Sequence, residues 1–414
     1  MFRKALLLSL LGGLSFSLTL REAVERALEN NLQIKAQYHR YEAAKNDFYA
    51  QVARRFGEVD FFWQYTQYKF PRAVAPIFPP TPTAVDDQVR VYGFRYAVRV
   101  FDGCGQFFLI KAKRDTARLE ERLLEKSSAE VKRDVRKLYL SALAVKAQIQ
   151  TLMERRREVE SLYRIVKTAY EVGKRPLLDL LNVRAELKRV DAAIANAEAN
   201  YNAILNDLKV VLNTDEPLEV EDVKISPKRV DAEDLLPLLL KGNPDLKAAE
   251  VQKRIADDYR RVALSQFSPK VDFSYTKQRY IFGGSSKDDW SYAISVSLPV
   301  FDFGNRLFTY LKASHEDRRA ERLRELLRRR VVQDLKTAVE RLNGQLEVIK
   351  ANREALEFAR RAYAVEKRKY QTGKSDIYNL LKAETLYYQA LSDYRTSVYR
   401  WGELKAELDY LLGR

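Results

Sequence analysis

The sequence is poor in the residues that build disulfide frameworks and metal centres. It contains one Cys and two His among 414 residues, and His39 and His315 lie far apart along the chain. A single Cys cannot form a disulfide within the chain, and no CxxC motif or Cys/His cluster is present for zinc. The sequence also lacks a recognisable Ser/His/Asp set and a phosphate-binding loop motif. We therefore expect a protein that is not an enzyme and that carries no metal and no cofactor.

The first residues have the pattern of a secretory signal peptide. Arg3 and Lys4 precede an apolar run at 5–14, and the small residues Ser15 and Ser17 follow it. We expect cleavage after Ser17, so that the signal peptide covers residues 1–17; a buried N-terminal helix is the alternative. No later apolar stretch approaches the roughly 18–20 residues of a membrane-spanning helix. A membrane role would therefore require β-strands or an interfacial surface.

The chain carries a large excess of positive charge. Its 73 Lys and Arg residues outnumber 57 Asp and Glu residues, which gives a formal net charge of +16. Such an excess is typical of nucleic-acid-binding proteins, and the runs at 155–157 and 328–330 are each three Arg residues long. An exported protein does not normally meet nucleic acid, and charge runs on helices are usually solvated faces. We therefore expect no nucleic-acid partner.

The sequence is an internal repeat. At an offset of 212 residues Asn31 aligns with Asn243, and at an offset of 200 residues Tyr170 aligns with Tyr370. The two offsets require an insertion in the first half, where the Pro-rich stretch 70–83 lies. Both registers extend over many other positions, so the two halves are copies of one unit.

Each half contains two segments in which apolar and polar residues alternate. This alternation predicts strands at 58–69 and 89–101 in the first half and at 270–281 and 289–301 in the second. A soluble sandwich and a transmembrane sheet both fit the pattern. The transmembrane reading predicts a lipid-facing aromatic belt made of Phe61, Trp63, Tyr65, Tyr92, Phe94, Tyr96, Phe273, Tyr275 and Tyr292. Four strands cannot close a barrel, so this reading requires two or three chains to share one.

Long helices occupy most of the remaining chain. Apolar residues spaced by three and four predict helices at 105–172 and 305–372, each about 100 Å long at 1.5 Å per residue. Shorter helices are predicted at 20–56, 176–213, 231–267 and 376–412. We expect a first repeat at 18–213, an acidic linker at 214–230 and a second repeat at 231–414. Such lengths fit coiled-coil packing.

The turns that join the long helices to the next helices are near copies of each other. One runs from Tyr170 to Asn182 and the other from Tyr370 to Lys382. Gly173 and Gly373 suit the left-handed residue that ends a helix. Taken alone, these segments are consistent with two ordinary capped helix turns.

The duplicated pattern resembles the TolC family of outer membrane efflux proteins. The resemblance rests on the segment 20–31, on the strand exits at 101–103 and 298–304, and on the two turns. It implies a homotrimer in which a twelve-stranded outer membrane β-barrel continues into a twelve-helix periplasmic α-barrel. It further implies a passive duct, for efflux or type I secretion, that works with a periplasmic adaptor protein and an inner membrane pump in a Gram-negative cell. A soluble periplasmic coiled-coil scaffold is the alternative.

The same resemblance implies roles for residues in the turns. The periplasmic gate or constriction would contain Tyr170, Asp179, Asn182, Tyr370, Asn379 and Lys382. The adaptor would dock on Gly173, Lys174, Leu180, Leu181, Gly373, Lys374, Leu380 and Leu381. Lys382 departs from the family pattern, because it puts a cation where the best-known members have a carboxylate. An acidic, cation-binding constriction is therefore not expected here.

Overall fold

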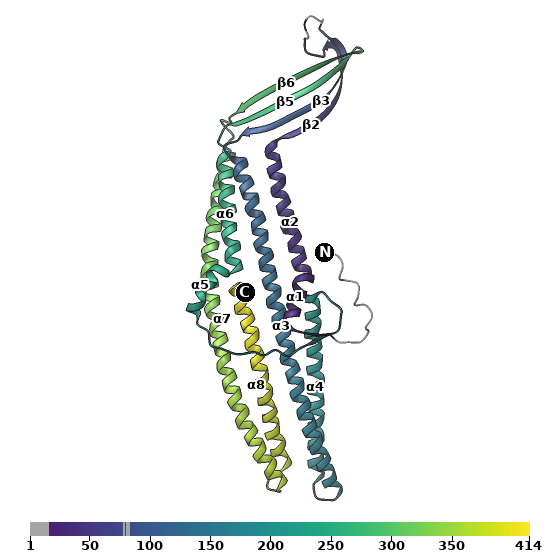
Figure 1. Ribbon diagram of the computed structural model, residues 1–414, viewed down its shortest axis with the longest axis vertical. Helices are drawn as coiled ribbons and strands as arrows, with labels where there is room; N and C mark the ends of the chain where they lie inside the picture. The colour runs from purple at the N-terminus through teal and green to yellow at the C-terminus, as the bar shows by residue number, and fades with distance from the viewer. Residues whose placement is uncertain (1–15, 78, 80–82) are drawn as a thin grey trace. The chain divides into compact units, whose positions relative to one another are not determined.

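The computed structural model describes residues 16–77, 79 and 83–414 (Figure 1). Most of the expected signal peptide, residues 1–15, lies outside the described residues. The described residues form two compact units, one of 16–36, 124–244 and 328–414 and one of 37–123 and 245–327. Each unit takes segments from both sequence repeats. The repeats at 18–213 and 231–414 are therefore not separate compact bodies.

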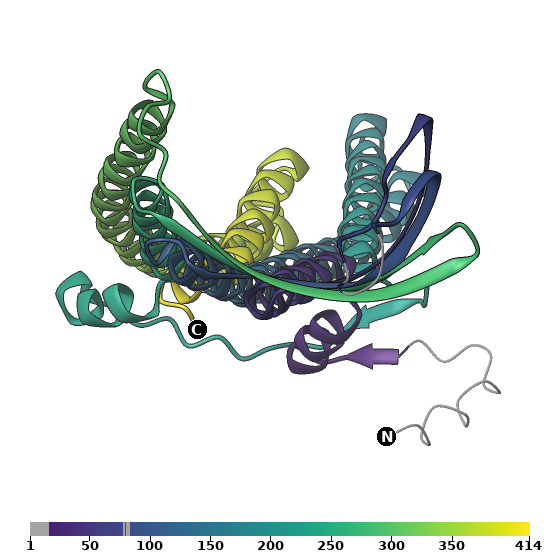
Figure 2. The ribbon, with the colours of Figure 1, turned by 90° about the horizontal axis from the view of Figure 1, so that it is seen from above.

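The second unit contains a four-stranded antiparallel sheet. Its strands are β2 (Glu58–Ala73), β3 (Val85–Phe101), β5 (Lys270–Phe282) and β6 (Ser285–Ser297), in the order β2-β3-β5-β6. Figure 2 shows that the sheet is strongly curved. Both β2 and β6 have one neighbour in this sheet, so each leaves one edge unpaired among the described residues.

Strand β6 differs from the predicted strand at 289–301 at both ends. It begins early because Gly283 and Gly284, with φ of +48° and +76°, make a two-residue hairpin turn that brings Ser285 opposite Phe282. It ends at Ser297, two residues before Pro299, which has no N–H to donate to a strand partner. Strands β2 and β3 also extend four residues further into the loop side than 69 and 89.

Helical segments precede or follow each strand of this sheet along the chain. They are α2 (Leu32–Ala53) with the 3₁₀ turn η1 (Arg54–Phe56), α6 (Pro244–Ser265), and the first parts of α3 (Gly105–Glu171) and α7 (Asn305–Gln371). Asp102 caps α3 by accepting from the Gln106 N–H at 2.8 Å, and Asp302 caps α7 by accepting from the Arg306 N–H at 3.0 Å. The two strand-to-helix junctions are thus built alike.

Polar residues also tie the helices of this unit together. Asp258 on α6 is fully buried and accepts from Lys111 Nζ on α3 at 2.8 Å. Asp115 on α3 is almost fully buried and lies 3.0 Å from Arg118 Nη1 and 3.4 Å from Arg254 Nε of α6. A buried carboxylate requires such partners, because burial of an unpaired charge is very costly. Among the described residues, no helix combines the length and the apolar character needed to cross a bilayer.

The first unit contains the other helices. It includes α1 (Leu20–Asn30), α4 (Leu177–Leu212), α5 (Ala232–Gly242) and α8 (Ile377–Leu411), together with the later parts of α3 and α7. The short strands β1 (Phe16–Leu18) and β4 (Leu218–Val220) pair in parallel, so β1 begins inside the range expected for the signal peptide. In Figure 1, α3 with α4 and α7 with α8 form two antiparallel pairs. We call these the first and the second helix pair.

Tyr139 on α3 lies in a hydrophobic core of this unit. Its ring is fully buried, and its hydroxyl lies 2.6 Å from the Leu18 carbonyl oxygen. The same hydroxyl accepts from the Glu221 N–H at 2.9 Å. The Tyr139 side chain thus links both β1 and the segment after β4 to α3 by hydrogen bonds.

In each repeat an Asn residue interrupts a predicted helix and bonds to the end of another helix. The expected helices 20–56 and 231–267 are each interrupted, at Asn31 and at Asn243. The Asn31 side-chain amide donates to the Val211 carbonyl of α4 at 2.9 Å, and the Asn243 amide donates to the Leu411 carbonyl of α8 at 3.0 Å. Each Asn therefore satisfies a carbonyl that the end of a helix leaves without an intrahelical partner.

Candidate functional site: the helical tips and the sheet face

The turns that close the two helix pairs have the same backbone geometry. In the first, the Gly173 N–H donates to Tyr170 O at 2.9 Å and the Lys174 N–H donates to Ala169 O at 2.7 Å. In the second, Gly373 and Lys374 make the equivalent bonds at 3.1 and 2.8 Å. The two glycines have φ of +74° and +71°, which glycine adopts without strain. The predicted left-handed glycines are present, and both are exposed.

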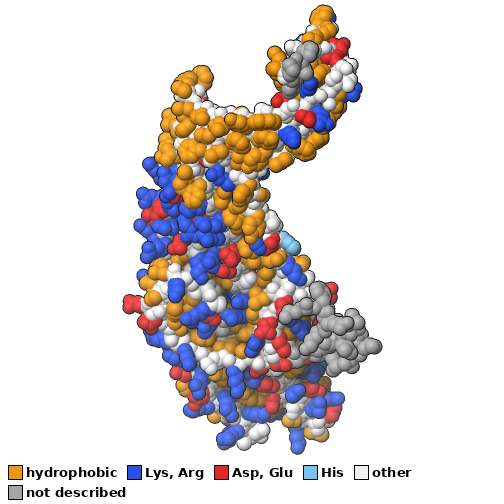
Figure 3. Space-filling view, turned by 45° about the horizontal axis from the view of Figure 1, so that its top comes forward, with side chains coloured by type: hydrophobic (Ala, Val, Ile, Leu, Met, Phe, Trp, Pro, Cys, Tyr) orange, Lys and Arg blue, Asp and Glu red, His pale blue; other side chains and the backbone are white. Residues whose placement is uncertain are grey.

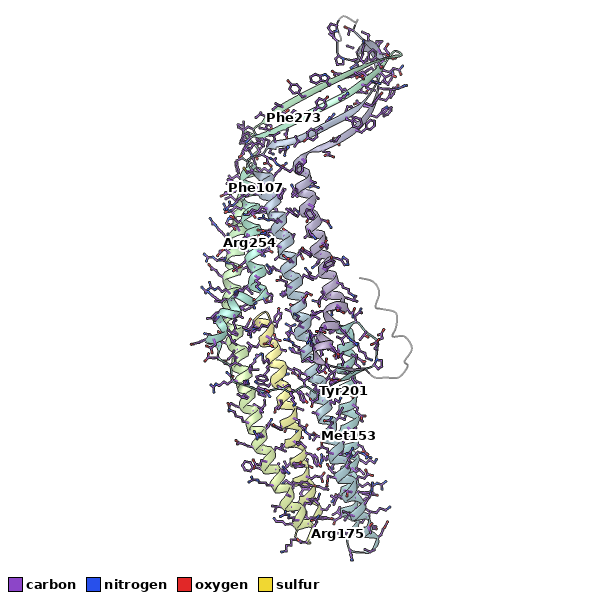
Figure 4. All side chains as sticks on the ribbon, viewed as in Figure 1. Phe107, Met153, Arg175, Tyr201, Arg254 and Phe273 are labelled. Carbon is purple, nitrogen blue, oxygen red and sulfur yellow. The ribbon has the colours of Figure 1, made fainter. Side chains whose placement is uncertain are left out.

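Arg175 contacts two of the predicted gate residues, Tyr370 and Asp179. Its guanidinium carbon lies 4.7 Å from the centre of the Tyr370 ring, and its Nη1 lies 3.6 Å from Asp179 Oδ2. Arg175 lies in the turn between the end of α3 and the start of α4 (Figure 4). Tyr370 is 8% exposed, and this burial raises the pKa of its hydroxyl. The contact between Arg175 and Tyr370 joins the first helix pair to the second.

Sequence reasoning did not single out Arg175. Its only signal was its place between the helix-ending Gly173 and Pro176, inside a segment already expected to form a tip. Side chains that are long and charged in such turns are usually solvated, and the presence of an aromatic partner from the other repeat could not be read from sequence.

The other predicted gate residues do not join this contact. Tyr170 is exposed and Asn182 is half-buried. The Asn379 N–H and side-chain amide both bond to the Asp376 carboxylate, at 2.7 and 3.1 Å, as part of the N-cap of α8. Lys382 is exposed and lines an open hollow of about 460 Å³ together with Asn379, Lys369 and Lys374.

The predicted docking residues divide by burial. Gly173, Lys174, Gly373 and Lys374 are exposed, and Leu181 is 49% exposed. Leu380 and Leu381 are instead buried in a hydrophobic cluster, and Leu180 packs against it. We call this the tip cluster; its buried members are Val159, Val166, Val183, Tyr370, Ile377, Leu380 and Leu381. Leu380 and Leu381 thus pack where the two helix pairs meet, and a docking role for them stays a prediction.

A buried group of charged residues lies further from the tips. Arg155 on α3 bonds to Glu186 on α4, and its Nη2 donates to Thr385 Oγ1 on α8 at 2.7 Å. Arg155 Nε also lies 3.6 Å from Glu384 Oε1 on α8. The side chains of Arg155, Glu186 and Glu384 are 12%, 11% and 2% exposed. We call Arg155, Glu186, Glu384 and Thr385 the inter-pair network, because it links both helix pairs.

Burial dominates the electrostatics of Glu384. It raises the pKa of this carboxyl to about 7, while the nearby Arg155 lowers it and Glu186 and Glu158 raise it. Two further ion pairs join the same helices: Glu158 of α3 with Lys367 of α7 at 3.0 Å, and Glu154 of α3 with Arg395 of α8 at 3.2 Å. The Arg run at 155–157 was expected to be a solvated face, and this expectation is wrong for Arg155.

The sheet carries the predicted aromatic belt on one face. Residues directly opposite one another in neighbouring strands share a face. Phe61 lies opposite Phe94, Trp63 opposite Tyr92, Tyr96 opposite Tyr275, and Tyr275 opposite Tyr292, and the remaining members follow by alternation. Figure 3 shows hydrophobic side chains gathered over the strands.

The opposite face of the sheet is mostly polar, although Phe62, Val89 and Val91 also lie on it. Arg99 Nε of β3 lies 2.8 Å from Asp272 Oδ1 of β5, and Ser274 lies opposite Ala97 and Ala293. The aromatic face is not uniformly apolar, because Arg279 and Asp288 form an ion pair in the same row as Trp63 and Tyr92. Among the described residues, no group of His, Cys, Asp and Glu side chains is arranged to hold a metal ion.

Comparisons with known proteins agree with this architecture. The family described as outer membrane efflux protein matches residues 23–214 and 235–414. No curated protein matches the sequence. A membrane protein from Pseudomonas aeruginosa has a similar structure, with a TM-score of 0.84 and 17% identity over 95% of this chain and 90% of that one. The outer membrane protein VceC from Vibrio cholerae gives 0.83 and 16%, over 95% and 96% of the two chains.

A third solved structure has the same fold. The Campylobacter jejuni CmeC outer membrane channel gives a TM-score of 0.80 and 16% identity, over 95% of this chain and 85% of that one. The fold class predicted from sequence, mainly helical with a duplicated strand-hairpin and long-helix unit, is therefore confirmed.

Proposed function

This chain belongs to the outer membrane efflux protein family, and from this premise we propose a trimeric exit duct that is opened and closed at its helical tips. The protein is a channel of the Gram-negative outer membrane with a large periplasmic helical portion. Family membership favours this function over a soluble periplasmic scaffold.

The proposed trimer rests on the unpaired strand edges. Strands β2 and β6 each leave one edge open, and open edges are not tolerated in lipid. Three copies of a four-stranded sheet would close a twelve-stranded barrel, with the nine-residue aromatic belt toward lipid and the polar face toward the lumen. The curvature of the sheet supports such closure.

The proposed gate lies where the two helix pairs meet. Arg175, Tyr370 and Asp179 link the pairs at the tips, and the inter-pair network links them again further along α3. Opening requires that such contacts between pairs break, so the gate is a two-state element. Exposed tip residues, including Lys174, Lys374 and Leu181, are available for a periplasmic adaptor that favours the open state. Energy for transport would come from the inner membrane pump, because the duct itself is passive.

Fractionation and cross-linking test this proposal. The full chain should be found in the outer membrane fraction and should have the mass of a trimer in neutral detergent. Replacing both Lys174 and Lys374 by Glu should reduce recovery of the cognate adaptor after cross-linking, whereas the exposed Lys350→Glu change on α7 should not. A monomer released by washing would contradict the duct, and unchanged adaptor recovery would contradict docking at the tips.

A further inference from the structure

A cavity lies between the two helix pairs close to the tips. Its volume is about 410 Å³, and its wall is formed by α3, the first tip turn, α7 and α8. Leu162, Val166 and Leu380 supply an apolar surface, and Tyr363 and Tyr370 supply aromatic rings. A space of this volume that combines apolar walls with polar groups is typical of small-molecule sites.

The charges of the cavity are divided between its two ends. On α3 the lining residues run from Glu158 to Ala169, which spans about 16 Å along the helix. Glu158 and Glu384 lie toward the far end, whereas Lys174 and Arg175 lie at the tip end. Glu158 and Lys367 form an ion pair at 3.0 Å and offset each other's charge. Glu384 is therefore the remaining acidic group of the far end, whereas the tip end is basic.

Glu384 is a cavity-lining carboxylate that its neighbours satisfy incompletely. It is 1% exposed, and its Oε1 has no hydrogen-bond partner among the described residues. Arg155 Nε, at 3.6 Å, is too distant for a hydrogen bond, and the Arg155 Nη2 group is taken up by Glu186 and Thr385. A buried acceptor without a hydrogen bond raises the free energy of the folded protein. Binding of a cation that donates the missing hydrogen bond would therefore be favourable.

We propose that this cavity binds an elongated, amphipathic organic monocation. Its charged head would be an ammonium group that donates a charge-assisted hydrogen bond to Glu384 Oε1. Its apolar body would lie along Leu162 and Val166. A second positive charge would meet Lys174 and Arg175 at the tip end, so a monocation is favoured over a dication.

Such a ligand would touch α3 of the first helix pair and α7 and α8 of the second. It would therefore stabilise the packed arrangement of the pairs by binding that arrangement more tightly than a separated one. The site lies inside the wall of one protomer, so its existence does not depend on what the lumen transports.

Titration calorimetry of the detergent-purified protein tests the site. We expect saturable binding of 4-phenylbutylammonium, whose N–H groups can donate to Glu384, and none of 4-phenylbutyrate, which reverses the charge. Glu384→Gln should weaken binding at least tenfold, and Ile165→Trp, which fills the cavity without removing a charge, should weaken it as much. The exposed Glu347→Gln change should leave the affinity as it is.

The pH dependence gives an independent readout. Because burial raises the pKa of Glu384 to about 7, lowering the pH from 8 to 5.5 should protonate the carboxyl and weaken cation binding. The affinity of Glu384→Gln should be flat over this range. Absence of saturable binding, equal binding of 4-phenylbutyrate, or an unchanged affinity in both cavity variants would each overturn the proposal.

Discussion

Replacing Arg155 by Met should favour the open gate. Arg155 contacts α4 through Glu186 and α8 through Thr385 and Glu384, so one substitution removes charged contacts within the first helix pair and between the pairs. Met retains an unbranched apolar stem of similar reach. The change therefore tests the charge and not the volume of the side chain.

The size of the effect follows from what the substitution leaves behind. Glu384 would keep no cation within the network, while Glu186 would keep Arg189, whose Nη1 lies 2.9 Å from its Oε2. Removing one partner of a buried ion pair typically costs about 3–5 kcal/mol. Glu384 can take up a proton because its pKa is already raised, so we expect the lower end, about 3 kcal/mol. Such a cost in the closed state shifts the open-to-closed ratio by about 150-fold.

Planar-bilayer recording measures this ratio directly. The open probability of the Arg155→Met channel should rise sharply at pH 7.5, with no change in the conductance of the fully open state. Arg361→Met is the matched control, because Arg361 pairs with Glu357 on the exposed side of α7 with side chains 71% and 60% exposed. Exposed helix pairs contribute about 0.3–0.5 kcal/mol, so this variant should gate as wild type does. An Arg155→Met channel that also gates as wild type does would refute the role of the network.

Three further predictions concern single side chains. Burial raises the pKa of Glu384 from 4.5 to about 7. The stabilisation of the packed helix pairs by Glu384 is therefore complete below pH 4.5 and is lost as the pH rises through 7. The open probability of the wild-type channel should increase from pH 5 to pH 8, and that of Glu384→Gln should not. Tyr139→Phe leaves the Leu18 carbonyl and the Glu221 N–H without this partner, which should cost about 1–3 kcal/mol and speed hydrogen exchange in β1 and β4, unlike Tyr378→Phe at an exposed site. Lys382→Asp should raise cation selectivity, and an unchanged reversal potential would count against a constriction at Lys382.

Much of the fold could be predicted because its signals are local and repeated. Apolar residues at three- and four-residue spacing indicated the long helices, and α3 and α7 have 67 residues each. Alternation indicated the strands, and their register places the nine predicted aromatic residues on one face. Gly173 and Gly373 indicated the turns, because few other residues adopt positive φ there.

The features that were missed depend on partners distant in sequence. Arg155 belongs to a run of three arginines, which is typical of a solvated helix face. It is buried because Glu186, Glu384 and Thr385 approach it from two other helices. The pairing of β1 with β4 joins three-residue strands about 200 positions apart, which are too short to produce a periodic signal. Leu380 and Leu381 were expected at a docking surface, but sequence alone could not show that they pack into the tip cluster.

Single-channel recording of the purified oligomer tests the central claim most directly. If three chains form one duct, the detergent-purified trimer should insert into planar bilayers in discrete steps of uniform conductance. Dissociation to monomers before addition should abolish these steps. A trimer that produces no conductance even with the Arg155→Met change, or monomers that conduct as the trimer does, would contradict the account.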